Sequence, residues 1–119
     1  MNLLDIFRNS DDLVKFPAGT VLFSEGVPGE HMYVVVEGQV EITLHDKLLA
    51  NAGPGEMVGE MALINSEIRS ATAITQTDCL LAYIDHASFD SMLRHVPDFS
   101  MHVMNVLTER LQSAYERVD

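Results

Sequence analysis

Short β-prone runs, broken at close intervals by glycine or proline, occupy residues 12–59 and constrain the fold more than any other feature. This punctuation is typical of an all-β sandwich or barrel. The clearest strands are predicted at Thr20–Ser24, Met32–Glu37 and Gln39–His45. From Val40 to Leu44 the apolar residues recur at every second position, which gives that strand one buried face.

Strand character returns at Ser70–Gln76 and Cys79–Ile84, and the chain then becomes helical. A helical pattern begins near Asp85 and restarts at Pro97, a residue that suits the first turn of a helix. The sequence therefore predicts a mainly β fold, an antiparallel jelly-roll β-barrel with C-terminal helices and one or two helical turns at residues 2–9.

The length of 119 residues predicts a single domain, 1–119, with a C-terminal helical lid at about 86–118. No apolar run approaches the roughly 20 residues that cross a bilayer, and the N-terminal residues lack a signal-peptide pattern. Cys79 is the one cysteine, which excludes an internal disulfide and suits a reducing compartment. We therefore expect a cytoplasmic protein without a membrane segment.

The formal net charge of −11, with only seven Lys and Arg residues, argues against direct binding to nucleic acid. In so acidic a chain, an anion site must be a local arrangement of donors. Arg69 and backbone amides are the predicted donors.

Residues 59–71 read GEMALINSEIRSA and hold the charged residues best placed for such a site. Glu60 follows a glycine and opens an apolar run, and Arg69 comes nine positions later. A short helix starting near Gly59 would offer free N–H groups to an anion. We interpret this stretch as a loop and short helix that hold a phosphorylated small ligand.

Two parts of the chain together resemble one family, the cyclic nucleotide-binding domains. Residues 16–26 and 33–42 resemble the first half of these domains, and residues 59–63 with 69–73 resemble their phosphate-binding cassette. The resemblance implies a regulatory sensor of a cyclic mononucleotide, not an enzyme, with no catalytic cofactor. The implied ligand-binding residues are Gly59, Glu60, Met61, Ala62, Arg69, Ser70 and Ala71.

The same resemblance implies separate roles for these groups. Glu60 would accept a hydrogen bond from the ribose 2′-hydroxyl, and Arg69 would donate to the exocyclic phosphate oxygens. The Ser70 hydroxyl and the Ala71 N–H would complete the phosphate shell. Ser70 suits cyclic AMP and cyclic GMP alike, and we favour cyclic AMP because the overall pattern looks bacterial. Tyr115 could stack on the base or pack on the barrel, and we do not count it as a site residue.

Two alternatives stay open at this point. In the first, Glu60 and Arg69 form a structural salt bridge, and the domain is an interaction module of the same fold without ligand. The second is a cupin-like metal enzyme, suggested by His31 followed by Glu37-Gly38. Metal sites need about three converging ligands. The remaining histidines fall in a predicted turn and in helices, so no metal site is predicted; they are His45, His86, His95 and His102.

The last helix carries apolar residues at alternating spacings of three and four: Met104, Leu107, Leu111, Ala114 and Val118. This seam predicts either packing on the chain's own barrel or a homodimer, which we weigh equally. The expected mechanism is a population shift, with a hinge near Asp85–Pro97 that lets the terminal helix close over the base. An effector protein is the other expected partner, and the sequence leaves open whether the chain is a stand-alone sensor or a fragment.

Overall fold

The computed structural model describes residues 3–66 and 68–116. Contacts within the chain divide it into two compact units, with the boundary between His86 and Ala87. This boundary lies at the predicted start of the helical lid, about residue 86. The assignment of residues 1–119 to a single domain stays a prediction.

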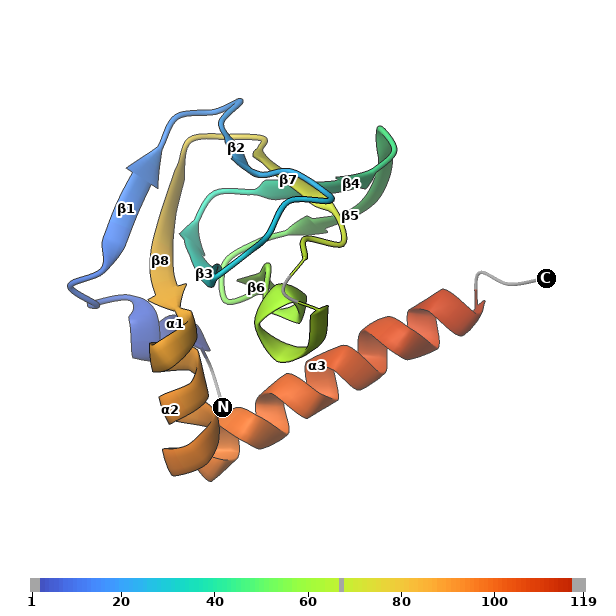
Figure 1. The fold of residues 1–119 in the computed structure, drawn as a ribbon. Helices are drawn as coiled ribbons and strands as arrows, with labels where there is room; N and C mark the ends of the chain where they lie inside the picture. Colours follow the sequence, from blue (N-terminus) through green and yellow to red (C-terminus); the bar gives the residue numbers. More distant parts are fainter. Residues whose placement is uncertain (1–2, 67, 117–119) are drawn as a thin grey trace. The chain divides into compact units, whose positions relative to one another are not determined.

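The first unit contains a short helix, eight β-strands and one π-helical turn among its described residues (Figure 1). In chain order these are α1 (Leu3–Phe7), β1 (Leu13–Phe16), β2 (Val21–Phe23), β3 (His31–Glu37), β4 (Val40–Leu44), β5 (Lys47–Ala52), β6 (Met57–Val58), the π-helical turn Ala62–Ser66, β7 (Thr72–Thr75) and β8 (Cys79–Asp85). The strands predicted from the sequence are confirmed, and their ends differ from the predicted ends by no more than two residues.

The strands form two antiparallel four-stranded sheets, ordered β1-β8-β3-β6 and β2-β7-β4-β5 (Figure 1). The prediction of a mainly β, jelly-roll-type fold with flanking helices is therefore confirmed, although the two sheets do not close into one barrel. Apolar side chains from both sheets form one buried cluster that includes Val35, Val40, Ala73 and Leu81.

Strand β3 has the longest run of buried residues among the described strands, since the five residues from Met32 to Val36 are all buried in succession. A strand with one covered face would alternate between buried and exposed residues. Helix α1 contacts β3 and has Leu3 and Phe7 buried. Leu3 and Phe7 are thus covered, whereas Ile6 of the same helix stays exposed.

The second unit consists of α2 (His86–His95) and α3 (Pro97–Glu116). The rings of Phe89 and Phe99 meet edge to face with centroids 5.9 Å apart, and the Ser100 hydroxyl donates to the carbonyl oxygen of Leu93 at 2.6 Å. Pro97 opens α3 as predicted, because its missing N–H costs nothing in a first turn.

On the predicted seam of α3, Met104 and Leu111 are exposed, and Val118 lies outside the described residues. Among the helices described, none has both the length and the apolar character needed to span a bilayer.

Candidate ligand-binding site

The segment from Gly59 to Ala71 leaves one sheet at the end of β6 and enters the other at β7. Gly59 turns the chain with φ of +87°, a backbone conformation that residues with a Cβ atom rarely adopt. A Cβ there would also lie 2.7 Å from Nη1 of Arg69 and 3.0 Å from the Phe23 ring. The predicted short helix is present as the π-helical turn, a form that is rare and often found at functional sites.

The Arg69 side chain is 3% exposed and is held by groups from three other places in the chain. Nη1 donates to the carbonyl oxygen of Gly59 at 3.0 Å, and Nη2 donates to that of His31 at 2.6 Å. Cζ lies 4.1 Å from the centroid of the Phe23 ring, in cation–π geometry. Burial lowers the pKa of Arg69 from its ordinary value, but a guanidinium stays charged in proteins.

The third nitrogen of this side chain, Nε of Arg69, has no hydrogen-bond partner. It is the one such buried side-chain nitrogen or oxygen found in the described part of the chain. A buried donor left unpaired costs about 1–3 kcal/mol, and more when it belongs to a charged group. Two carbonyl groups thus hold the Nη atoms of the guanidinium, while its Nε has no acceptor among the described residues.

The other predicted site residues lie in the same segment and differ in how exposed they are to solvent. Glu60 is 1% exposed, and Ala62 and Ala71 are also buried. Met61 is exposed, and Ser70 is exposed with its hydroxyl 4.0 Å from the sulfur of Met61. The segment thus holds a buried carboxylate and a buried guanidinium, and the Ser70 hydroxyl lies at the surface.

Sequence reasoning missed the second wall of the site, the loop of residues 24–30 between β2 and β3. This loop binds the backbone of Arg69 on both sides: Gly26 N donates to Arg69 O at 2.9 Å, and Arg69 N donates to Val27 O at 2.8 Å. Pro28 and Ile68 form an isolated β-bridge next to these bonds. The signal that could have revealed this wall is the pair of glycines in the loop, since glycine marks close backbone approach.

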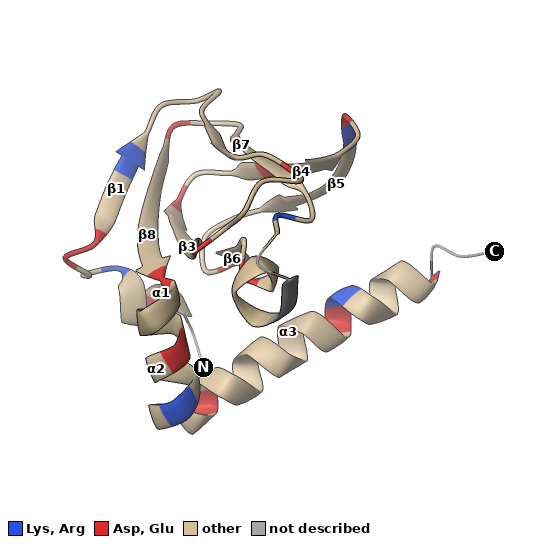
Figure 2. Cartoon of the chain, in the orientation of Figure 1, with Lys and Arg blue, Asp and Glu red and all other residues tan. Residues whose placement is uncertain are grey.

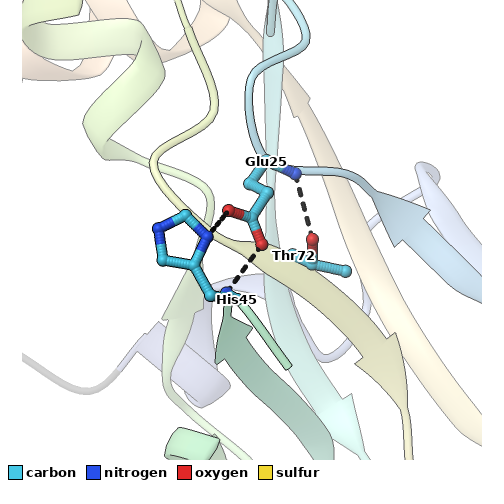
Figure 3. Close-up of polar contacts among 3 residues, drawn as sticks. All are labelled: Glu25, His45 and Thr72. Atoms are coloured by element: carbon cyan, nitrogen blue, oxygen red, sulfur yellow. Dashed lines mark hydrogen bonds and ion pairs between the residues drawn. The ribbon is translucent and has the colours of Figure 1, made fainter. Parts of the chain in front are cut away.

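The same loop is attached to the start of β7 and to the β4–β5 hairpin through Glu25 (Figure 3). Glu25 N donates to the Thr72 hydroxyl at 3.0 Å, and its carboxylate accepts from His45 N at 3.0 Å. Nδ1 of His45 lies 3.2 Å from the other carboxylate oxygen. His45 and Asp46 have φ of 51° and 65°, as in a type I′ hairpin turn, so the turn predicted there is confirmed.

Charged groups elsewhere do not assemble a second candidate site. Figure 2 shows Lys and Arg residues spread over separate elements of the chain. In the ranges 3–66 and 68–116, no three His, Cys, Asp or Glu residues lie close enough to hold a metal ion. The thiol of Cys79 is buried and donates to the carbonyl oxygens of Gln39 and Thr77, each at 3.3 Å.

Residues 13–96 match the family described as "Cyclic nucleotide-binding domain". The chain belongs to the cyclic nucleotide-binding domain family. The match includes both walls of the site, the loop 24–30 and the cassette 59–71, and it confirms the resemblance seen in the sequence.

Relatives of known name support this membership. The chain is 31% identical over 104 residues to the CRP-like cAMP-activated global transcriptional regulator of Mycobacterium tuberculosis, a match that covers 83% of this chain and 46% of the relative. The catabolite activator protein of Thermus thermophilus superposes with a TM-score of 0.81 at 29% identity, covering 90% of this chain and 53% of that one. A structure from work on a cyclic-GMP-dependent signalling pathway in bacterial phytopathogenesis superposes with a TM-score of 0.72 at 32% identity, covering 85% and 84%.

The chain spans less than half the length of the curated relatives that it matches first. By their names, relatives of this cyclic nucleotide-binding domain include transcriptional regulators, a potassium channel and a kinase regulatory subunit. The chain is thus similar to part of several proteins whose names differ in function.

Proposed function

We propose that this domain binds a cyclic mononucleotide, with cyclic AMP favoured over cyclic GMP, and acts as a regulatory sensor. The observation that carries the proposal is the buried guanidinium of Arg69, whose Nε has no acceptor within the described chain. Hydrogen bonds between a charged donor and a charged acceptor are among the strongest in proteins, and an anionic phosphate would supply the missing acceptor.

The remaining cassette groups have distinct roles in this proposal. The carboxylate of Glu60 accepts from the ribose 2′-hydroxyl, a role that a carboxylate could not take toward a phosphate because both are anions. The hydroxyl of Ser70 and the N–H of Ala71 donate to phosphate oxygens, next to Gly59, Met61 and Ala62. The small or absent side chains at positions 59, 62 and 71 leave room for the sugar and phosphate.

The choice of base is proposed from the named relatives and from the pattern of the chain. One relative is named as activated by cAMP, and a similar structure comes from a cyclic-GMP-dependent pathway. Ser70 is compatible with either base. We favour cyclic AMP because the overall pattern of the chain looks bacterial, and we propose that bound nucleotide changes the position of α3 to signal to a second copy of the chain or to an effector protein.

Titration calorimetry with cyclic AMP, cyclic GMP and cyclic di-GMP tests this function directly. We expect saturable binding of cyclic AMP, weaker binding of cyclic GMP, and an affinity at least about a hundredfold lower in Arg69→Ala, because charge-assisted bonds to phosphate are the strongest in the site. Arg94→Ala is the matched control, since Arg94 is exposed and pairs with Asp90 on α2.

Two results would contradict the proposal. If the wild-type chain produces no binding heat with any of the nucleotides while its circular dichroism shows a folded protein, the ligand-free interaction module becomes the better reading. If Arg69→Ala binds as tightly as the wild type, the phosphate is not held by this guanidinium.

A further inference from the structure

We propose that Gly29 is a positioning residue for Arg69, and that the space left by its missing side chain determines where the guanidinium points and how tightly the site binds an anion. The steric part of this inference stands on the described contacts alone. Only its effect on nucleotide affinity rests on the proposed function.

The contact between Gly29 and Arg69 leaves no room for a Cβ atom. A Cβ built on Gly29 would lie 2.2 Å from Nε, 2.4 Å from Cζ and 2.8 Å from Cδ of Arg69. These separations are far shorter than van der Waals contact, so the arginine would have to move.

The backbone gives no other reason for a glycine at this position. Gly19, Gly26, Gly38, Gly55 and Gly59 have positive φ, whereas Gly29 does not. An alanine at residue 29 would therefore not incur the penalty that side chains pay at positive φ. The requirement for glycine comes from the guanidinium that lies against it.

The guanidinium has little freedom to yield to a new side chain. Its two Nη atoms are held by the carbonyl oxygens of His31 and Gly59, and its Cζ lies over the Phe23 ring. The backbones on both sides are also tied together, because Gly26 N donates to Arg69 O and Arg69 N donates to Val27 O. A Cβ at position 29 would therefore push the side chain away from its carbonyl partners.

This geometry assigns the loop of residues 24–30 a share in ligand recognition. The loop supplies the anchor for the Arg69 backbone and the close contact at Gly29. His31, the first residue of β3 directly after the loop, supplies one of the two carbonyl groups. These contacts occupy both Nη atoms and hold Nε in one place. The direction of the free Nε–H is consequently fixed by the loop as well as by the cassette.

The decisive experiment is the ¹H–¹⁵N NMR signal of the arginine Nε–H group, which reports on Arg69 with no ligand present. In the wild type we expect one slowly exchanging Nε–H signal that disappears in Arg69→Ala, since the exposed Arg94 exchanges fast. In Gly29→Ala this signal should shift and exchange at least about tenfold faster, because the displaced guanidinium meets solvent.

Gly53→Ala is the matched control. Gly53 also has no positive φ, and the atoms nearest to a Cβ there belong to the flexible side chain of Gln39, at 3.0 Å or more. This variant should keep the wild-type Arg69 signal. An unchanged signal in Gly29→Ala, or an equal change in Gly53→Ala, would overturn the inference.

Nucleotide titration adds the functional readout. Gly29→Ala should bind cyclic AMP at least about tenfold more weakly than the wild type, while Gly53→Ala binds normally. If the wild type binds no nucleotide, the proposed function fails, and the NMR comparison still decides the positioning role. If Gly29→Ala does not fold, the double variant Gly29→Ala/Arg69→Ala replaces it, because it removes the side chain that the new Cβ would meet. The double variant should fold, and a double variant as unfolded as Gly29→Ala would overturn the inference.

Discussion

Nη2 of Arg69 donates a hydrogen bond to the carbonyl oxygen of His31, and the positive charge of Arg69 also acts on the His31 imidazole. The pKa of the His31 imidazole is lowered from its ordinary value by burial and by the positive charge of Arg69, against a smaller raising effect of Glu30. The ring stacks on Tyr83 with centroids 4.9 Å apart and meets the edge of Tyr33 at 5.2 Å. The folded protein therefore favours a neutral His31.

This preference predicts a dependence of stability on pH. A histidine whose pKa is lower in the folded state binds more protons when the protein is unfolded. Its contribution to the free energy of unfolding is therefore complete above the unfolded pKa of about 6.5, and it is lost as the pH falls from there to the folded pKa. In urea unfolding, the stability of the wild type relative to His31→Gln should decrease between pH 7.5 and 5.5. A difference that stays constant with pH would contradict this prediction, and the loss of stacking on Tyr83 alone would give such a constant difference.

Glu60 leads to a prediction about the sugar. Its carboxylate is buried, and a hydrogen bond to a charged group contributes about 1.5–3 kcal/mol. We therefore expect Glu60→Gln to weaken cyclic AMP binding by about ten- to a hundredfold. In the wild type, 2′-deoxy cyclic AMP should show a similar loss.

Binding of 2′-deoxy cyclic AMP to Glu60→Gln combines the two changes and tests the contact more directly. If Glu60 acts on the 2′-hydroxyl, the deoxy ligand should bind Glu60→Gln about as well as cyclic AMP does, because the same interaction is removed from either side. Glu41→Gln on β4 is the control for the loss of one negative charge. Losses that simply add would show that Glu60 acts elsewhere in the site.

At the scale of elements, the sequence was sufficient for the terminal helices and for five strands, β2, β3, β4, β7 and β8, whereas β1, β5 and β6 were not individually predicted. The strands β2, β3 and β4 have the β-branched runs and turn residues that favour them locally, and Pro97 marks the start of α3. Glu60 and Arg69 could be selected as site candidates because charged residues inside an apolar stretch are unusual.

The second wall of the site was not predictable in this way. Gly29 and Arg69 are 40 positions apart, and local periodicity carries no information about which loop faces the cassette. The π-helical form of the cassette helix was also missed, because local helix propensity does not distinguish a π-helical turn from an α-helical one. The sheets, expected as one closed barrel, are two because closure depends on strand tilt and stagger, which no single strand encodes.

At the scale of the whole molecule, the joint between α2 and α3 bears on signalling. The Phe89–Phe99 ring pair and the bond from Ser100 to Leu93 O connect the two helices within their own unit. If bound nucleotide changes the position of α3, these contacts should make α2 follow. The hinge would then fall at the start of the predicted segment Asp85–Pro97, close to the boundary between His86 and Ala87.

Hydrogen exchange measured by mass spectrometry tests this motion. With saturating cyclic AMP, peptides from α2 and α3 should change in protection by several-fold, and those from the buried strand β3 should not. Identical protection of both helices with and without nucleotide would rule out the helix as the signalling element. A change in α3 without one in α2 would place the hinge at Pro97.

Three apolar residues of the cassette are left open to solvent: Met61 is 51% exposed, Ile64 46% and Ile68 42%. Covering apolar surface lowers the heat capacity of a protein, whatever group provides the cover. If nucleotide binding leads to the covering of these side chains, the binding enthalpy must become more favourable with rising temperature. The apolar side chains of the cassette would then make the binding enthalpy depend on temperature, which the polar contacts of Arg69 alone would not do.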